Sequence, residues 1–360
     1  MYQSIQACRA VAAVLVLFFH AGGNLAKEKY FGAAAEPLAR LFISGGSAGV
    51  AFFFVLSGFI IVLVHGGDFG HPERLGRYVR RRVTRIYPTY LVIFLGVYAG
   101  ALLVPALRDA MPTDAAVLLR SMLLLPQDPA VVGGTGAPVI VVAWSLQYEL
   151  VFYALIGLAI VNPALGWAAV AALAVVVAAR PMGWAWAEQF PLSFLANPLM
   201  ILFGMGAAVG GLERAGWRMP RPVPVAIGAG VLFLALCALA TWRNEAHGTW
   251  FALGYGLSGA IAIAALIQAE RERPAQMRTR AGALLGDASY ALYLIHFPLI
   301  AVLCKLAVAA GLQGRAGAVV AFVAISLVCV GVSVLFYLWV ERPMLAALAP
   351  APRRSAPRAV

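Results

Sequence analysis

An arginine and a histidine share one predicted helix near the start of the chain. Arg9 and His20 are eleven residues apart in an apolar stretch, which puts them within about 20° of one helix face and roughly 16 Å apart along the axis. A neutral imidazole can act as a general base near neutral pH, and a guanidinium can stabilise a developing negative charge. The alternative is structural: Arg9 reaches the headgroups at one interface, and His20 makes a hydrogen bond at the other.

A carboxyl group lies in a second apolar stretch, at the end of the sequence Trp144-Ser145-Leu146-Gln147-Tyr148-Glu149. Ser145, Glu149 and Phe152 have i, i+4, i+7 spacing, which predicts a narrow polar stripe on the inward face of a helix. A buried carboxylate needs a cationic neighbour, or it becomes protonated and donates a hydrogen bond. A catalytic and a purely structural role for Glu149 both stay open.

A second histidine, His296, is predicted near the middle of a later helix, two residues before Pro298. A proline leaves a backbone carbonyl without its partner one turn earlier and can kink the helix. His296 therefore either assists the chemistry at His20 or satisfies this local backbone geometry.

Three arginines, Arg81, Arg82 and Arg85, precede the third apolar stretch. Their i, i+3 and i, i+4 spacing brings the three side chains to one patch of a helix. A guanidinium fork suits phosphate oxygens, so the patch is a candidate phosphate site. The alternative is the ordinary excess of basic residues in cytoplasmic loops, together with contacts to lipid headgroups.

The sequence contains no metal-ligand set, dinucleotide-binding glycine fingerprint, P-loop or GxSxG nucleophile elbow. We therefore expect no metal cofactor. The four cysteines stand singly in apolar runs, without the spacing of a metal site or a CxxC motif, and we interpret them as small packing residues. They are Cys8, Cys237, Cys304 and Cys329.

The composition predicts the elements that must position these groups. Hydrophobic residues make up 62% of the 360 residues and charged residues 12%, with a mean hydropathy of +0.87. A soluble domain has about 25% charged residues, so this chain has too little polar surface for a water-soluble globule. Its apolar stretches are long enough to cross a bilayer, and lipid leaves the backbone no hydrogen-bond partner, so each stretch must be helical. We predict an all-α, polytopic integral membrane bundle.

The apolar stretches predict about ten transmembrane helices, at residues 5–22, 43–65, 86–107, 140–161, 164–180, 193–212, 222–241, 249–268, 284–310 and 316–340. With the N-terminus inside, the predicted inner segments carry seventeen arginines, and the predicted outer segments carry eight basic residues. The positive-inside rule then predicts that both termini are cytoplasmic. The net charge of +12 is explained by this topology, and we expect no nucleic-acid partner.

The chain shows no linker or repeat that would divide it. We expect one transmembrane domain at residues 1–345 and a disordered cytoplasmic tail at residues 346–360, which is rich in proline. The longest predicted connection, residues 108–139, lies on the outer side. It contains a predicted interfacial helix at 115–125, and it suits a lid, an acceptor-binding surface or a plain connection.

These motifs, in this order, resemble the acyltransferase 3 family of polytopic membrane acyltransferases, especially bacterial members that modify exopolysaccharides or other envelope glycans. Arg9 and His20 are similar to the family's basic residue and histidine on the first helix. The resemblance continues along nearly the whole chain through five further motifs: Gly45-Gly46-Ser47-Ala48-Gly49-Val50-Ala51-Phe52-Phe53-Phe54-Val55-Leu56-Ser57-Gly58-Phe59, Arg82-Val83-Thr84-Arg85-Ile86-Tyr87-Pro88, Trp144 to Glu149 with Phe152-Tyr153, Ser289 to Pro298, and Glu341-Arg342-Pro343.

The chain departs from the family pattern at two positions. The second-helix motif commonly has an acid where this chain has Ala51, and the sixth helix often has a glutamate near Leu202. A proton or hydrogen-bond role carried by those acids therefore does not transfer to this chain. Glu149 is the interior carboxylate that is left.

The resemblance implies a bacterial inner-membrane enzyme that moves an acyl group, with acetyl favoured, from acyl-CoA to a sugar hydroxyl. On this reading Arg81, Arg82 and Arg85 bind the phosphates of the donor, and His20 is the general base. Glu149 orients His20, and Arg9 or the backbone amides near Gly45 and Gly46 stabilise the oxyanion. His296, Trp144 and Tyr293 line the acceptor site, and the acceptor is a glycan or a lipid-linked saccharide.

Two other classes stay open at this stage. A transporter or flippase of a lipid-linked sugar would also need interior arginine, glutamate and histidine residues and a hydrated path. A non-catalytic scaffold of a glycan-synthesis complex would account for the two missing acids. Transfer of label from acyl-CoA to glycan separates an enzyme from both.

Overall fold

The computed structural model describes residues 2–104, 108, 111–274 and 279–348. In these ranges the chain forms helices and turns without a strand, which confirms the predicted all-α class. Eight helical segments there are long and apolar enough to cross a membrane. Their main helices are α1 (Gln3–Leu25), α3 (Ile43–His65), α4 (Leu75–Leu103), α8 (Trp144–Val161), α12 (Pro222–Arg243), α13 (Thr249–Glu272), α14 (Arg280–Ala309) and α15 (Gly314–Phe336). The chain is a multi-pass membrane protein.

Two further helices occupy predicted spans but are shorter. α9 (Pro163–Ala179) has 17 residues and α11 (Met200–Arg214) has 15. The predicted span 193–212 is broken because α10 (Leu192–Leu195) ends before Asn197 and Pro198. Fifteen helical residues extend about 22 Å, less than the roughly 30 Å of a hydrocarbon core. The predicted ten crossings and cytoplasmic termini stay predictions.

The helix α16 (Arg342–Leu348) follows a π-helical turn at Tyr337–Glu341. Residues 346–348 of the predicted tail are therefore helical, and the rest of that tail lies outside the described residues.

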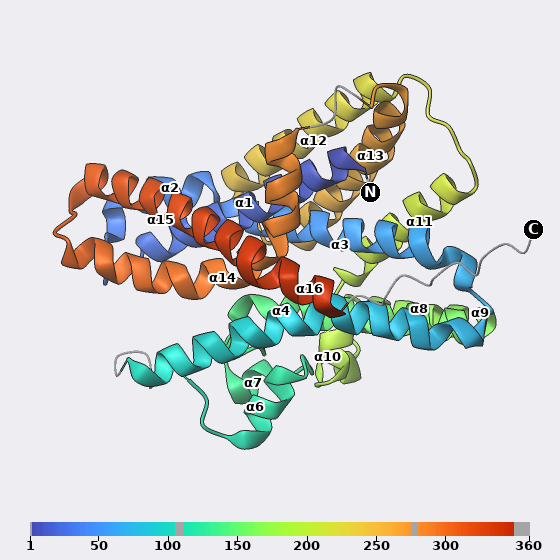
Figure 1. Cartoon of the computed structure of the whole chain (residues 1–360), viewed down its shortest axis with the longest axis horizontal. Helices are drawn as coiled ribbons and strands as arrows, with labels where there is room; N and C mark the ends of the chain where they lie inside the picture. Colours follow the sequence, from blue (N-terminus) through green and yellow to red (C-terminus); the bar gives the residue numbers. More distant parts are fainter. Residues whose placement is uncertain (1, 105–107, 109–110, 275–278, 349–360) are drawn as a thin grey trace, which may run out of the picture.

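The helices form two groups (Figure 1). α1 packs against α3 and α14 in the upper group, and α4 and α8 lie together below them. Tyr78 on α4 joins the lower pair by donating a hydrogen bond to the Tyr153 carbonyl oxygen over 2.9 Å.

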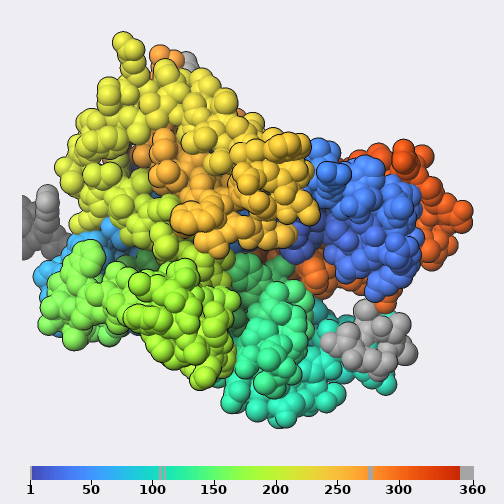
Figure 2. Space-filling model, turned by 180° about the vertical axis from the view of Figure 1, so that it is seen from behind, coloured from blue at the N-terminus to red at the C-terminus, as the bar shows by residue number. Residues whose placement is uncertain are grey.

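The long predicted connection folds back onto the lower group. α6 (Ala115–Met122) begins at Asp114, whose side chain accepts from the Val117 amide at 2.9 Å. On α4, Tyr87 and Tyr90 donate hydrogen bonds to backbone oxygens of residues 123 and 121. Seen from behind, this segment lies beside the segment that contains α10 (Figure 2). The predicted helix in this connection is thus present, and it packs along α4.

Segments that the arginine bias assigns to one side of the membrane meet at one end of the bundle. Glu213 on α11 forms an ion pair with Arg271 on α13 and accepts a hydrogen bond from Tyr2 at 3.1 Å. Glu270 accepts from the Gln3 and Ser4 amides at the start of α1. We call this the arginine end.

Glycines bring α3 and α11 into close contact. A Cβ atom at Gly206 would collide with the Val55 carbonyl, and one at Gly58 would collide with the Phe203 carbonyl. Small residues allow such close approach of two helices in a membrane. This contact fixes the position of α3, which lines both cavities described below.

We expect Gly206→Ala to destabilise the protein by roughly 1–3 kcal/mol, because an added methyl group in a packed contact forces the backbones apart. Gly204→Ala is the matched control on the same helix, since a Cβ atom there meets nothing within 4 Å. Thermal unfolding in detergent measures both. Equal melting temperatures for the two variants would contradict the close contact.

Candidate active site

Two cavities lie inside the bundle. The larger, about 1060 Å³, is lined by arginines of α4 and by α1, α3, α8 and α14, and we call it the arginine cavity. The smaller, about 380 Å³, contains His20 and His247, and we call it the histidine cavity. Val50 and Tyr293 line both cavities. The two cavities therefore adjoin at these side chains.

The arginine cavity is lined by basic side chains from three elements, α1, α4 and α16. Arg81, Arg82 and Arg85 line it together with Arg9 of α1. The three arginines predicted to share a patch thus lie around one space, and that space extends to Arg9. Arg77, Arg80 and Arg342 add further positive charge to its lining.

Aromatic rings and one acid hold two of these arginines. Arg82 lies over the Tyr153 ring at 5.6 Å, and Arg85 lies over the Tyr290 ring at 5.5 Å. Arg85 also pairs with Glu341 at 3.6 Å, and that carboxylate is fully buried in the π-helical turn. A buried charge is tolerated in an apolar interior when it is paired. Glu341, part of the last family-like motif, therefore positions Arg85.

A hydrogen-bonded chain positions Arg9. Its Nη1 donates to Gln6 Oε1 at 3.1 Å, and Gln6 Nε2 donates to Asp287 Oδ1 at 2.7 Å. Tyr337 donates to the second oxygen of Asp287 at 3.3 Å. Arg9 is therefore oriented by α14 and by the π-helical turn.

Glu149 lies on the wall of the arginine cavity. Its Oε1 accepts hydrogen bonds from Ser57 and Tyr153, each at 2.6 Å. Because one carboxyl oxygen accepts both bonds, Glu149 is a hydrogen-bond acceptor whose position is fixed by two hydroxyl groups. The expected pairing of Glu149 with His20 is not seen, because the two side chains line different cavities.

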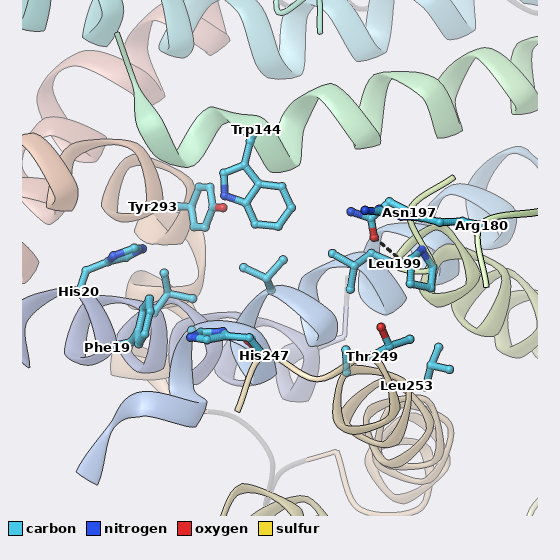
Figure 3. Close-up of a pocket in the computed structure, with 16 residues that line it drawn as sticks. Phe19, His20, Trp144, Arg180, Asn197, Leu199, His247, Thr249, Leu253 and Tyr293 are labelled. Carbon is cyan, nitrogen blue, oxygen red and sulfur yellow. Dashed lines mark hydrogen bonds between the residues drawn. The ribbon is translucent and has the colours of Figure 1, made fainter. Parts of the chain in front are cut away.

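Hydrogen-bonded hydroxyl groups lie at the boundary between the two cavities. The Tyr293 hydroxyl lies 2.7 Å from Ser145 Oγ and donates to the Val142 carbonyl oxygen at 3.1 Å. Trp144, one residue before Ser145, lines the histidine cavity. The two predicted substrate contacts, Trp144 and Tyr293, thus lie next to each other at this boundary (Figure 3).

His20 lines the histidine cavity, and His296 lies directly behind it. The two rings have centroids 5.2 Å apart, and His296 is fully buried. His296 Nδ1 bonds to the Leu292 carbonyl oxygen at 2.8 Å, so Nδ1 carries the proton and Nε2 is free to accept in the neutral ring. Nε2 has no hydrogen-bond partner within the described part of the chain. His296 thus contacts His20 and does not line either cavity.

The histidine cavity includes groups that the sequence did not single out. His247, before α13, lies with Nδ1 2.7 Å from Ser47 Oγ, and burial lowers the pKa of this imidazole below its ordinary value. Arg180 and Asn197 lie on the side of the cavity away from His20 (Figure 3). These three residues lie in connections between helices or at a helix end. At such positions neither hydrophobic periodicity nor burial in a membrane helix indicates a functional residue. The Asn197-Pro198 break in an apolar stretch was the one available signal.

Metal ligation finds no support in the described ranges. They contain no group of three or more histidine, cysteine, aspartate or glutamate residues that could hold a metal ion.

The fold and the site together define a multi-pass membrane protein with two adjoining cavities, one lined by arginines and one by histidines. The family described as "Acyltransferase domain" matches residues 2–338, and the chain therefore belongs to the acyltransferase 3 family. It is a membrane acyltransferase. This family membership favours acyl transfer over the transporter and scaffold alternatives.

Two curated proteins are similar over most of their length. The exopolysaccharide production protein ExoZ of Rhizobium meliloti (strain 1021) is 28% identical over 320 residues, which cover 87% of this chain and 93% of that protein. The acyltransferase MdmB of Streptomyces mycarofaciens is 28% identical over 329 residues, which cover 82% of this chain and 78% of that protein. No solved structure gives a significant match.

Proposed function

We propose that this protein moves an acyl group, with acetyl favoured, from cytoplasmic acyl-CoA to a sugar hydroxyl of an exopolysaccharide or another envelope glycan. The observation that carries the proposal is the pair of adjoining cavities, one rich in arginine and the other containing His20. A donor and an acceptor entering from opposite ends would meet at Val50 and Tyr293. The printed name of ExoZ supports the exopolysaccharide class of acceptor.

The donor occupies the arginine cavity. Arg81, Arg82 and Arg85 bind the phosphates of coenzyme A, because guanidinium forks form paired, charge-assisted hydrogen bonds to phosphate oxygens. The arm of the donor extends past Arg9 toward the boundary. A polar wall along this path is formed by Glu149, Ser57 and Tyr153. These side chains exchange hydrogen bonds with the amide groups of the arm.

The acceptor occupies the histidine cavity, where His20 is the general base. His20 takes the proton of the acceptor hydroxyl as its oxygen attacks the thioester carbonyl carbon. The tetrahedral intermediate then expels the thiolate of coenzyme A, which takes up the proton held by His20 to give the thiol, so His20 is regenerated and the acyl group stays on the sugar as an ester. Proton transfer of this kind contributes roughly 10²–10⁴ in rate.

Two features support these steps. Gly46 lies near the N-terminus of α3 and lines the histidine cavity, and the positive end of the helix dipole favours a developing negative charge there. This end of α3 is favoured over Arg9 for stabilising the oxyanion, because Arg9 lines the other cavity. The His296 ring lies 5.2 Å from the His20 ring, and its Nε2 has no hydrogen-bond partner within the described residues, so during transfer this nitrogen would accept from one nitrogen of His20 and leave the other basic.

The sided arrangement follows from the charge. We place the arginine end at the cytoplasmic face of a bacterial inner membrane, because acyl-CoA is made in the cytoplasm. The histidine cavity then lies toward the outer side. The positive-inside rule supports this orientation. Residues 1–345 then act as one transmembrane domain.

We expect His20→Ala to abolish transfer of labelled acetyl from acetyl-CoA to envelope glycan, with a loss of at least about 100-fold in rate. Purified protein in proteoliposomes gives the rate, and the melting temperature verifies folding. His71→Ala is the control, because His71 is exposed and lies outside both cavities. Wild-type transfer by a folded His20→Ala protein would remove His20 from the mechanism.

The arginine patch has a separate test. Arg82→Ala with Arg85→Ala should raise the KM for acetyl-CoA by roughly 10–100-fold, because charge-assisted hydrogen bonds to phosphate are lost. The KM for the glycan should not change. Arg315→Ala, on an exposed arginine outside both cavities, serves as the control for loss of an arginine elsewhere. If the double variant keeps its KM for acetyl-CoA, the arginines serve topology alone.

A further inference from the structure

The histidine cavity has a positive lining. Arg180 is the guanidinium among its lining residues, and no aspartate or glutamate lines it. His20 and His247 also face it and carry no negative charge in any state. An anionic ligand is therefore favoured here over a cationic one.

Arg180 is available to bind a ligand. Its Nε pairs with Glu188 Oε1 at 3.4 Å, and the two side chains are 45% and 55% exposed. Ion pairs this exposed contribute only about 0–1 kcal/mol. In the described part of the chain the two Nη atoms show no partner, so the fork of the guanidinium can take an anion while Nε keeps its contact.

The rest of the cavity suits a sugar. The rings of Trp144, Phe19 and Tyr293 provide flat apolar surfaces, and Asn197 and Thr249 provide polar groups on the side away from His20 (Figure 3). A volume of about 380 Å³ is near the lower end of the range for ligand pockets, roughly 300–1,000 Å³. The cavity therefore takes a terminal sugar unit and not a long stretch of polymer.

The two functional ends of the cavity are separated. His20 lies at one side, and Arg180 and Asn197 lie at the other, with the aromatic rings between them (Figure 3). A saccharide that spans the cavity can place one hydroxyl at His20 while a negative group several bonds away lies at Arg180. Arg180 would then select which sugar, and which of its hydroxyls, reaches the base.

We propose that the acceptor is an anionic saccharide whose carboxylate or phosphate binds Arg180 while the hydroxyl to be acylated lies at His20. This inference rests on the proposed acyl transfer to a glycan and narrows its acceptor class. A carboxylate from an acidic sugar and a phosphate from a lipid-linked saccharide offer the same chemistry to the guanidinium fork.

The test uses the cell's own glycans. Envelope glycans and lipid-linked saccharides are extracted and separated by anion exchange, and each fraction is given to proteoliposomes that contain the full-length protein and labelled acetyl-CoA. Fractions retained by the exchanger should accept label, and unretained fractions should not. Carboxyl reduction of the active fraction removes acceptance if the anion is a carboxylate, and cleavage of sugar phosphates removes it if the anion is a phosphate.

Variants assign the effect to Arg180. Arg180→Gln should raise the KM for the active fraction by about tenfold or more and leave the KM for acetyl-CoA unchanged. Glu188→Gln frees the guanidinium and should not raise the KM for the glycan. Arg243→Gln is the matched control, since Arg243 forms a similar exposed pair with Glu245 at 3.5 Å and does not line the cavity.

Two results would overturn the inference while leaving acyl transfer intact. One is equal labelling of retained and unretained fractions, and the other is an Arg180→Gln protein with the KM of the wild type. If no fraction accepts label from the wild-type protein, the proposed function itself is wrong.

Discussion

Lipid cannot solvate a charge, so every ionised side chain inside this bundle must face a cavity or a polar partner. The first helix meets this constraint at two depths: Arg9 faces the arginine cavity, and His20 faces the histidine cavity. One rigid helix therefore fixes the separation of the two groups at roughly 16 Å. The elements around α1 must therefore supply polar groups at each depth, and Val50 and Tyr293 lie at the boundary between the two cavities.

The two cavities differ in the chemical groups that line them. In the arginine cavity the guanidinium groups contact aromatic rings and carboxylates. The buried Glu341 pairs with Arg85, and Asp287 orients Arg9 through a hydrogen bond from Gln6. Such anchoring fixes the positions of Arg85 and Arg9 on the wall of the cavity, where the remaining N–H groups face the space that a phosphate would occupy. The histidine cavity is smaller, and its lining combines two histidines, the Arg180 guanidinium and aromatic rings. Such a lining suits a sugar and a base that must lose and gain a proton.

Composition and spacing predicted the all-helical membrane class and the convergence of the arginines, because both depend on local sequence. The shortening of α11 was missed because the average hydropathy of residues 193–212 stays high and hides the helix-breaking pair Asn197-Pro198. The separation of Glu149 from His20 was also missed. It depends on how α8 is rotated and shifted against α1, which is set by close helix contacts such as the one between Gly206 and α3. His247, Arg180 and Asn197 reach the cavity from connections and a helix end, where hydrophobic periodicity carries no information.

The central claim is that donor and acceptor meet where the two cavities adjoin, at Val50 and Tyr293. The most direct test is the Val50→Trp variant, whose indole would fill this junction, with Val50→Ile as the conservative variant that adds one methylene group. Binding of labelled acetyl-CoA and acyl transfer to glycan are measured on the same proteoliposomes. The structure predicts that Val50→Trp binds acetyl-CoA as the wild type does but transfers at least tenfold more slowly, about 1.4 kcal/mol or more in activation free energy, while Val50→Ile keeps both activities. Wild-type transfer by Val50→Trp would contradict the claim.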